Sequence, residues 1–250
     1  MSRTARREQV RANLATARTR IAGACATVGR DPAEITIVAI TKTFPTSDVA
    51  LLAELGITQV GENRDQEARV KAQECGGLGL TWHFVGQLQR NKAGSVARYA
   101  DVVQSVDRGA LIGALDRGAG AAGRRLGICV QVDLSEAGAD TGGGPDLGPE
   151  AGRTLHRGGA RPDGVLALAD LVAGAEHLDL LGVMAVAPLG ADPQPAFDRL
   201  AAVHDRVLLG HPQARMRSAG MSGDLEAAVA AGATHVRLGS ALLGHREPLK

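Results

Sequence analysis

Short apolar runs that alternate with helix-like segments constrain the fold of this chain more than any other feature. Most of these runs contain β-branched residues, and a polar or amphipathic stretch follows each run. Strands that alternate with helices in this way predict parallel βαβ units. The eight runs are Ile35–Lys42, Gln59–Asn63, Thr81–Gly86, Asp101–Asp107, Leu126–Leu134, Leu178–Pro188, Met216–Met221 and His235–Ser240.

Eight predicted strands in a chain of 250 residues favour a closed (β/α)8 barrel of the TIM type. The alternative is an open doubly wound sheet, which usually has fewer strands and binds ligands where the strand order reverses. No Gly-x-Gly-x-x-Gly motif follows the first predicted strand, which weakens the dinucleotide-binding form of that alternative. We therefore predict a single barrel domain over residues 1–250.

The segments outside the strands predict helices and one long loop. An apolar stripe at three- and four-residue steps predicts an N-terminal helix within residues 1–30 that ends near Gly29. The segments "SDVALLAELG" and "SGDLEAAVAAG" each begin with a serine, Ser47 and Ser222, that suits a helix N-cap. Residues 135–163 are rich in Gly and Pro, and we predict a loop insertion there, not a domain boundary. The N-terminal stripe consists of Val10, Leu14, Ala17, Ile21, Cys25 and Val28.

Charge and composition exclude several classes of function. The net charge is +1 and aromatic residues make up 2%, so neither general attraction to nucleic acid nor base stacking is expected. No apolar run approaches the length of a membrane span. Cys25, Cys75 and Cys129 are widely spaced, which fits a reducing cytoplasm and argues against disulfides or a zinc site. We expect a cytoplasmic protein with no bound metal.

Lys42 ends the first predicted strand, in "ITIVAITKTFP", and is one of only four lysines in the chain. In a barrel of this class the active site lies at the C-terminal ends of the strands. We expect an ammonium beside this apolar strand to be partly buried and poorly solvated. A lysine in such a place can form a Schiff base with a carbonyl, whereas an arginine cannot. The alternative is a side chain that reaches into solvent or toward a nearby acid.

Two glycine-containing turns follow the seventh and eighth predicted strands. Ser222 and Gly223 lead from a strand into a helix, where free N–H groups and a hydroxyl suit a phosphate, although a simple N-cap explains the serine equally well. Gly239 and Ser240 repeat the arrangement after the last strand. Phosphate sites after strands seven and eight recur in this fold. Because strand one closes beside strand eight, the lysine and both turns describe a pocket for a phosphorylated aldehyde.

Six ordered motifs carry a resemblance that covers nearly the whole chain. They resemble the pyridoxal phosphate homeostasis protein family, which is similar to the N-terminal barrel of alanine racemase. The resemblance implies an alanine racemase N-terminal-domain-like barrel that carries pyridoxal 5′-phosphate (PLP) as a Schiff base on Lys42. The motifs are "IVAITKTFP", "VGENRDQEA", "WHFVGQLQRNK", "VVQSVDR", "LGVMAVAP" and "SAGMSGDLEAAVAAGATHVRLGSALLG".

The same resemblance implies the other cofactor-binding residues. Asn63 corresponds to a residue near the cofactor ring. Arg237 matches an arginine near the pyridine nitrogen, which would keep that nitrogen unprotonated and weaken the ring as an electron sink. Met221 precedes the phosphate turn and either lines the pocket or fills the core. The full set is Lys42, Asn63, Met221, Ser222, Gly223, Arg237, Gly239 and Ser240.

Three further positions bear on the site. His83 alternates with Trp82 and Phe84 along a predicted strand, so we expect a hydrogen-bonded core histidine, with a group near the cofactor as the alternative. Tyr99, the one tyrosine, precedes strand four and is expected to lie far from the strand ends. Asp133 stands where the family commonly has asparagine, and the lysine that usually follows it is missing.

The implied function is a carrier of PLP and not an enzyme. A racemase needs a second acid or base on the far face of the substrate, and the residues show no candidate. The resemblance implies PLP binding and a role in PLP and amino-acid homeostasis, without established turnover. Our own hypothesis adds PLP-dependent apoenzymes as recipients of the cofactor. We expect a monomer. The alternatives are a weak PLP-dependent racemase and a lysine-dependent aldolase on the same barrel.

Overall fold

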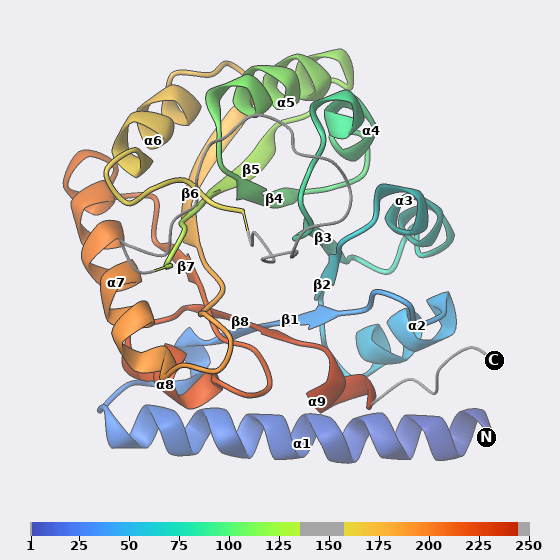
Figure 1. Cartoon of the computed structure of the whole chain (residues 1–250). Helices are drawn as coiled ribbons and strands as arrows, with labels where there is room; N and C mark the ends of the chain where they lie inside the picture. The colour runs from blue at the N-terminus through green and yellow to red at the C-terminus, as the bar shows by residue number, and fades with distance from the viewer. Residues whose placement is uncertain (1, 136–157, 245–250) are drawn as a thin grey trace, which may run out of the picture.

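Eight parallel strands close into a barrel in the order of the sequence, which confirms the predicted (β/α)8 fold (Figure 1). The structure is a computed structural model and describes residues 2–135 and 158–244. Each strand begins within one residue of its predicted start. The strands are β1 (Thr36–Ile40), β2 (Gln59–Glu62), β3 (Thr81–Phe84), β4 (Val102–Val106), β5 (Leu126–Gln131), β6 (Leu178–Met184), β7 (Met216–Ser218) and β8 (His235–Leu238).

Helices surround the barrel, and two of them, α1 and η1, precede the first strand. The α-helices are α1 (Arg3–Thr27), α2 (Thr46–Glu54), α3 (Asp65–Glu74), α4 (Ala93–Val96), α5 (Gly109–Ala121), α6 (Val165–Ala173), α7 (Pro193–Gly210), α8 (Leu225–Ala230) and α9 (Ser240–Leu243), and two 3-10 helices are η1 (Pro32–Glu34) and η2 (Arg90–Lys92). The loop predicted over 135–163 falls mostly on residues 136–157, outside the described part of the chain.

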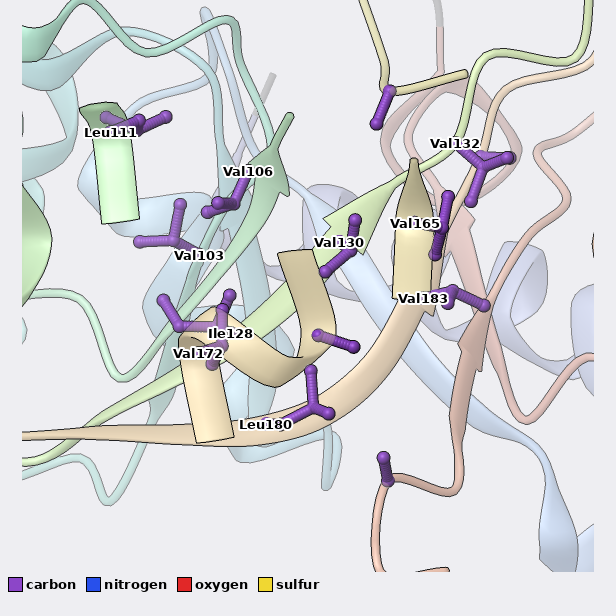
Figure 2. Close-up of a cluster of buried hydrophobic side chains, with 14 of the residues drawn as sticks. Val103, Val106, Leu111, Ile128, Val130, Val132, Val165, Val172, Leu180 and Val183 are labelled. Carbon is purple, nitrogen blue, oxygen red and sulfur yellow. The ribbon is translucent and has the colours of Figure 1, made fainter. Parts of the chain in front are cut away.

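The largest apolar cluster lies between the strands and the outer helices. In Figure 2, valines and leucines of β4, β5 and β6 face side chains of α5 and α6. Ile128 and Val130 of β5 are fully buried there, whereas Cys129 between them joins Val102 and Met216 in a smaller cluster. Successive side chains on a strand point to opposite faces, so that smaller cluster fills the barrel interior.

Helix α1 crosses the outside of the barrel below β8 and β1 and packs against α8 and α9 (Figure 1). Its predicted apolar stripe is buried from Val10 to Cys25, which confirms the N-terminal helix. Val28 is the exception: the helix ends at Thr27, and Val28 is 41% exposed. Polar side chains of α1 also reach the ends of the short helices, because Asn13 Nδ2 donates to the Leu242 carbonyl at 2.8 Å.

The two predicted serine N-caps are wrong. Helix α2 begins at Thr46 with Pro45 at its N-cap, so Ser47 lies inside the first turn. Helix α8 begins at Leu225 with Asp224 at its N-cap, and Ser222 lies two residues before that cap. Neither cap residue bonds the helix through its side chain. Ser222 is therefore available for the other role that its sequence context predicted.

Gly182 in β6 gives the first stability prediction. Its φ is +150°, and a Cβ there would lie 1.9 Å from the Met216 carbonyl oxygen on β7. Gly182→Ala should therefore lower the free energy of unfolding by about 3 kcal/mol, through overpacking and backbone strain together. Gly113→Ala on α5 is the control, because a Cβ at Gly113 meets only the end of the Arg117 side chain at 3.5 Å.

Urea titration of both variants checks this expectation. The control should match the wild type or gain roughly 0.5 kcal/mol from the better helix propensity of alanine. Equal stability of the Gly182→Ala and Gly113→Ala proteins would contradict the packing of β6 on β7.

Candidate functional site

The candidate site lies at the mouth of the barrel, the name we give to the end formed by the C-terminal ends of the strands. Lys42 follows β1 in a turn at this mouth, but its side chain is exposed. The expectation of a partly buried ammonium is therefore wrong. The reason is local, because the strand ends at Ile40 and only Thr41 continues into the buried layer, at 0% exposure.

The turn that carries Lys42 is held from both sides. Thr41 Oγ1 donates to Glu62 Oε1 at 2.7 Å, and the backbone N–H of Thr43 donates to Glu67 Oε1 at 2.6 Å. Thr43 has a φ of +68° and is the only non-glycine residue with positive φ among those described. A left-handed β-branched residue costs roughly 1–2 kcal/mol, so the surrounding contacts must hold it in place.

A second lysine, Lys71 of α3, occupies the buried position beneath this turn. Its Nζ donates to Thr41 O at 2.8 Å, Glu62 Oε1 at 2.7 Å and Glu67 Oε1 at 2.6 Å. Burial raises the pKa of Glu62 despite its bonds to Lys71 and Thr41. Burial alone would also raise the pKa of Glu67, but the hydrogen bonds from Lys71 and the Thr43 N–H outweigh this effect and lower the pKa of that carboxyl. The sequence reasoning missed this cluster.

The two predicted phosphate turns meet at the mouth. Ser240 Oγ donates to Ser222 Oγ at 3.4 Å, and the backbone N–H of Ala241 donates to the same oxygen at 3.3 Å. The backbone N–H groups of Ser222 and Gly223 have no hydrogen-bond partner among the described residues. Unpaired N–H groups beside two hydroxyls form a donor set that suits an anion.

Met221 and Gly239 border these turns. The backbone N–H of Met221 donates to Asp224 Oδ1 at 2.6 Å, so it is not available to a ligand, while the Met221 side chain is 36% exposed at the mouth. Gly239 links the turns to β1, because a Cβ at Gly239 would lie 3.5 Å from the Ile40 carbonyl oxygen. The end of β8 therefore lies against the end of β1, two residues before Lys42.

Arg237 of β8 points into the barrel below the mouth. Its guanidinium donates to Ser218 Oγ and to the Ala185 carbonyl, both at 2.7 Å. Burial lowers the pKa of Arg237 to about 10, so the group stays charged at neutral pH. Its hydrogen-bond partners are neutral oxygens, and no carboxylate among the described residues forms an ion pair with it. The structure thus places a buried cation beneath the candidate site.

A row of polar side chains continues from Arg237 across the interior. Ser218 Oγ donates to Gln104 Oε1 at 2.7 Å, Gln104 Nε2 lies 2.8 Å from His83 Nδ1, and His83 Nε2 lies 2.6 Å from Gln59 Oε1. His83 is therefore a hydrogen-bonded core histidine, as expected. Burial and the nearby His235 lower the pKa of His83 to about 3, and burial lowers that of His235 to about 4.

These shifts predict an acid-sensitive fold. The pKa of His83 is lower in the folded chain than the ordinary value of about 6.5, so the unfolded chain binds the proton more tightly. The neutral form stabilises the fold above about pH 6.5, and stability falls as the pH drops toward 3. His83 alone should remove about 2 kcal/mol between pH 7 and pH 5.

Urea titration at both pH values, with wild type and His83→Gln, measures the contribution of His83. The variant should lose less stability than the wild type between pH 7 and pH 5, because it lacks the His83 imidazole. The loss that remains should come from His235, which still titrates. An identical loss in both proteins would show that His83 accepts a proton in the folded state.

Asn63 and Tyr99 occupy different surroundings. Asn63 follows β2 at the mouth and is half-buried, and a Cβ at Gly86 would lie 2.2 Å from its carbonyl oxygen. Only glycine at position 86 allows this close approach of the β3 loop. Tyr99 lies in the turn before β4, and burial together with Asp65 and Glu62 raises its pKa. A buried tyrosine with a raised pKa is a poor proton acceptor at neutral pH.

Other parts of the chain show fewer signs of chemistry. A cavity of about 470 Å³ lies at the N-terminal ends of β1 and β2, away from the mouth, and is lined by residues such as Ile35, Ile57 and Gln59. No cluster of three metal-ligating side chains occurs within residues 2–135 and 158–244. In the same residues no helix has the length and apolarity that crossing a bilayer requires. All three cysteines are buried and none forms a disulfide among the described residues.

Comparisons with known proteins show the family of this chain. The sequence matches the family described as the N-terminal domain of alanine racemase over residues 6–247. The "Pyridoxal phosphate homeostasis protein" of Mycobacterium tuberculosis is 44% identical over 249 residues, which cover 93% of this chain and 91% of that protein. The protein of the same name from Escherichia coli is 35% identical over 241 residues, with 94% and 96% covered.

Solved structures show the same barrel. PipY of Synechococcus elongatus, in a structure with PLP bound, has a TM-score of 0.77 and 31% identity over 94% of this chain and 100% of that chain. An alanine racemase of Clostridium difficile has a TM-score of 0.71 at 16% identity, over 97% of this chain and 58% of that chain. At this low identity the racemase likeness shows the fold alone.

Proposed function

Because the chain belongs to the pyridoxal phosphate homeostasis protein family, we propose that it binds PLP as a Schiff base on Lys42 and serves intracellular PLP homeostasis. The observation that carries the proposal is the closure of β8 on β1. It brings the Lys42 turn to the same side of the mouth as the hydroxyls of Ser222 and Ser240. An amine beside a set of anion-binding donors fits an aldehyde that also bears a phosphate.

Each end of PLP has matching residues in this chain. PLP supplies an aldehyde that condenses with a primary amine and a phosphate that needs hydrogen-bond donors. The N–H groups of Ser222 and Gly223 and the hydroxyl of Ser240 would bind the phosphate. Gly239 allows the second turn to lie close to β1. The exposed side chain of Lys42 is free to turn toward the mouth, since no described residue forms a hydrogen bond or ion pair with its Nζ.

Three other residues would shape the ring pocket. Asn63 lies at the end of β2, next to the strand that carries the lysine, and Met221 offers an apolar surface at the mouth. The guanidinium of Arg237 has only donors, so a pyridine nitrogen beside it would stay unprotonated. An unprotonated ring withdraws fewer electrons and supports less carbanion chemistry.

We propose a carrier and not a catalyst for this site. Turnover at the α-carbon of an amino acid needs a base on each face of the substrate or a strong electron sink. Tyr99 is too buried to supply the base, and Arg237 opposes the electron sink. The match to the alanine racemase N-terminal domain keeps weak racemase activity as the second candidate.

One experiment separates the two candidates. The protein as isolated, or after loading with PLP, should show the absorbance of a bound Schiff base. Incubation of this protein with L-alanine in deuterated water should exchange the α-proton no faster than free PLP does. Faster exchange with a bound chromophore would establish racemase-like chemistry, and absence of any chromophore after loading would reject PLP binding itself.

Helix α1 gives a prediction about the phosphate turn. Arg20 Nη1 donates to the Ser222 carbonyl at 2.9 Å, and its other nitrogens bind Glu226 of α8 at 2.8 Å. Arg20→Met keeps the aliphatic stem and removes these bonds, so PLP affinity should fall about fivefold as the turn loses its anchor. Arg11→Met is the control, because Arg11 pairs with Glu8 on the same helix.

Equilibrium dialysis with PLP measures both variants against the wild type. An unchanged affinity in Arg20→Met, or an equal loss in Arg11→Met, would show that α1 does not support the turn.

The setting of this function is also a proposal. We propose a cytoplasmic protein, supported by three buried cysteines that are free of disulfides. We propose PLP-dependent apoenzymes as recipients of the cofactor and a monomeric, single-domain state for residues 1–250. Size-exclusion chromatography with light scattering tests the monomer.

A further inference from the structure

A buried charge cluster lies directly beneath the turn that carries Lys42. Glu62 of β2 is 1% exposed and Lys71 of α3 is 5% exposed, so both charges are removed from water. Burial of a charge is expensive unless it is paired and hydrogen-bonded. The Lys71 ammonium meets this condition, since its three N–H donors have three partners: Thr41 O, Glu62 and Glu67.

The cluster forms hydrogen bonds to the chain on each side of Lys42. On one side, Thr41 is bonded twice, through its carbonyl to Lys71 and through its hydroxyl to Glu62. On the other side, the Thr43 N–H is bonded to Glu67. Glu67 Oε1 also accepts from Lys71, so the hydrogen bonds on both sides belong to one network. Lys42 itself takes no part in it.

The conformation of Thr43 needs stabilising hydrogen bonds of this kind. Its φ of +68° lies in the left-handed region, which is unfavourable for a β-branched residue. A charge-assisted hydrogen bond to the Thr43 N–H favours this conformation over extended alternatives. Without that bond, the turn would relax toward conformations that direct residue 42 elsewhere.

We propose that Lys71 and Glu67 are positioning residues, which fix the turn at Thr41–Thr43 so that Lys42 is presented to the aldehyde of PLP. This inference rests on the proposed function of Lys42. It also explains why two lysines at the mouth have different roles. An ammonium whose three donors are bonded to two carboxylates and a carbonyl is held as a cation, so Lys71 is not available as a nucleophile.

The test uses Glu67→Ala, because Lys71→Met would leave the buried Glu62 carboxylate without its cation and could unfold the protein. Hydrogen exchange on the protein without PLP reports the turn directly. In Glu67→Ala the amide of Thr43 should exchange at least tenfold faster than in the wild type. Stopped-flow absorbance should then show PLP capture slowed by about tenfold, because the competent turn is populated less.

Glu74→Ala is the matched control. Glu74 lies on the same helix and also bonds the segment after β1, but through the Thr46 hydroxyl, beyond the Lys42 turn. It should leave both the Thr43 exchange and the rate of PLP capture within twofold of the wild type. Glu67→Gln retains an acceptor oxygen and should recover part of the lost rate.

The two readouts separate failure of this inference from failure of the proposed function. If the Thr43 amide exchanges at the wild-type rate in Glu67→Ala, Glu67 does not hold the turn. Faster exchange at Thr43 with wild-type capture would overturn the positioning role while PLP binding on Lys42 stands. If the wild type captures no PLP, the proposed function fails, and the positioning role fails with it.

Discussion

Replacing Lys42 by alanine should give a folded protein that loses PLP during dialysis and carries no label after borohydride reduction. The exposed side chain supports no hydrogen bond or ion pair among the described residues, so its removal should leave the melting temperature of the PLP-free protein unchanged. The phosphate turns remain, and they should hold PLP only weakly and reversibly. Absorbance of the dialysed protein measures the loss, which we expect to be nearly complete.

Lys92→Ala is the control for this experiment. Lys92 ends η2 on the loop that follows β3, and it is not part of the proposed pocket. This variant should retain PLP as the wild type does. Retention of a borohydride-stable label in Lys42→Ala would contradict the assignment of the amine and would direct attention to another lysine.

Replacing Ser222 by aspartate should weaken PLP binding by about 100-fold or more. A carboxylate at this position would face the phosphate across a few ångströms, and two like charges at such a distance repel by several kcal/mol even in a partly solvated site. The aspartate can still accept from the Ala241 N–H, as Ser222 Oγ does at 3.3 Å, so the turn should fold. Equilibrium dialysis measures the change.

Pyridoxal provides the internal control, since it has the aldehyde but no phosphate. Its binding to Ser222→Asp should match its binding to the wild type. Ser47→Asp, on the exposed first turn of α2, should bind PLP normally. Equal losses for PLP and pyridoxal would mean that residue 222 affects the fold of the mouth and not the phosphate.

The barrel could be predicted because its signals are local and repeated. Most strands are short apolar runs bounded by turn residues, and β5, buried at every position, begins with an uninterrupted apolar segment. The helix starts were harder to predict. Ser47 and Ser222 have the side chains of N-caps, yet Pro45 and Asp224 occupy those positions. The residue that occupies the N-cap depends on where the loop from the preceding strand enters the helix. No local sequence pattern encodes that position.

The candidate site could be predicted in outline and not in its supports. The position of Lys42 after β1 follows from the strand pattern, but the hydrogen bonds that hold its turn come from Lys71, which is buried beneath it. The spacing of Glu67 and Lys71 suits an ordinary surface ion pair of a helix. That this pair turns inward to meet Glu62 depends on how α3 packs against β2, a contact between segments that the sequence alone does not specify.

The location of the covalent attachment tests the central claim most directly. Wild-type protein loaded with PLP, reduced with borohydride and digested should give one modified peptide by mass spectrometry, with the pyridoxyl group on Lys42. A pyridoxyl group on Lys71 or Lys92, or no modified peptide at all, would contradict the account.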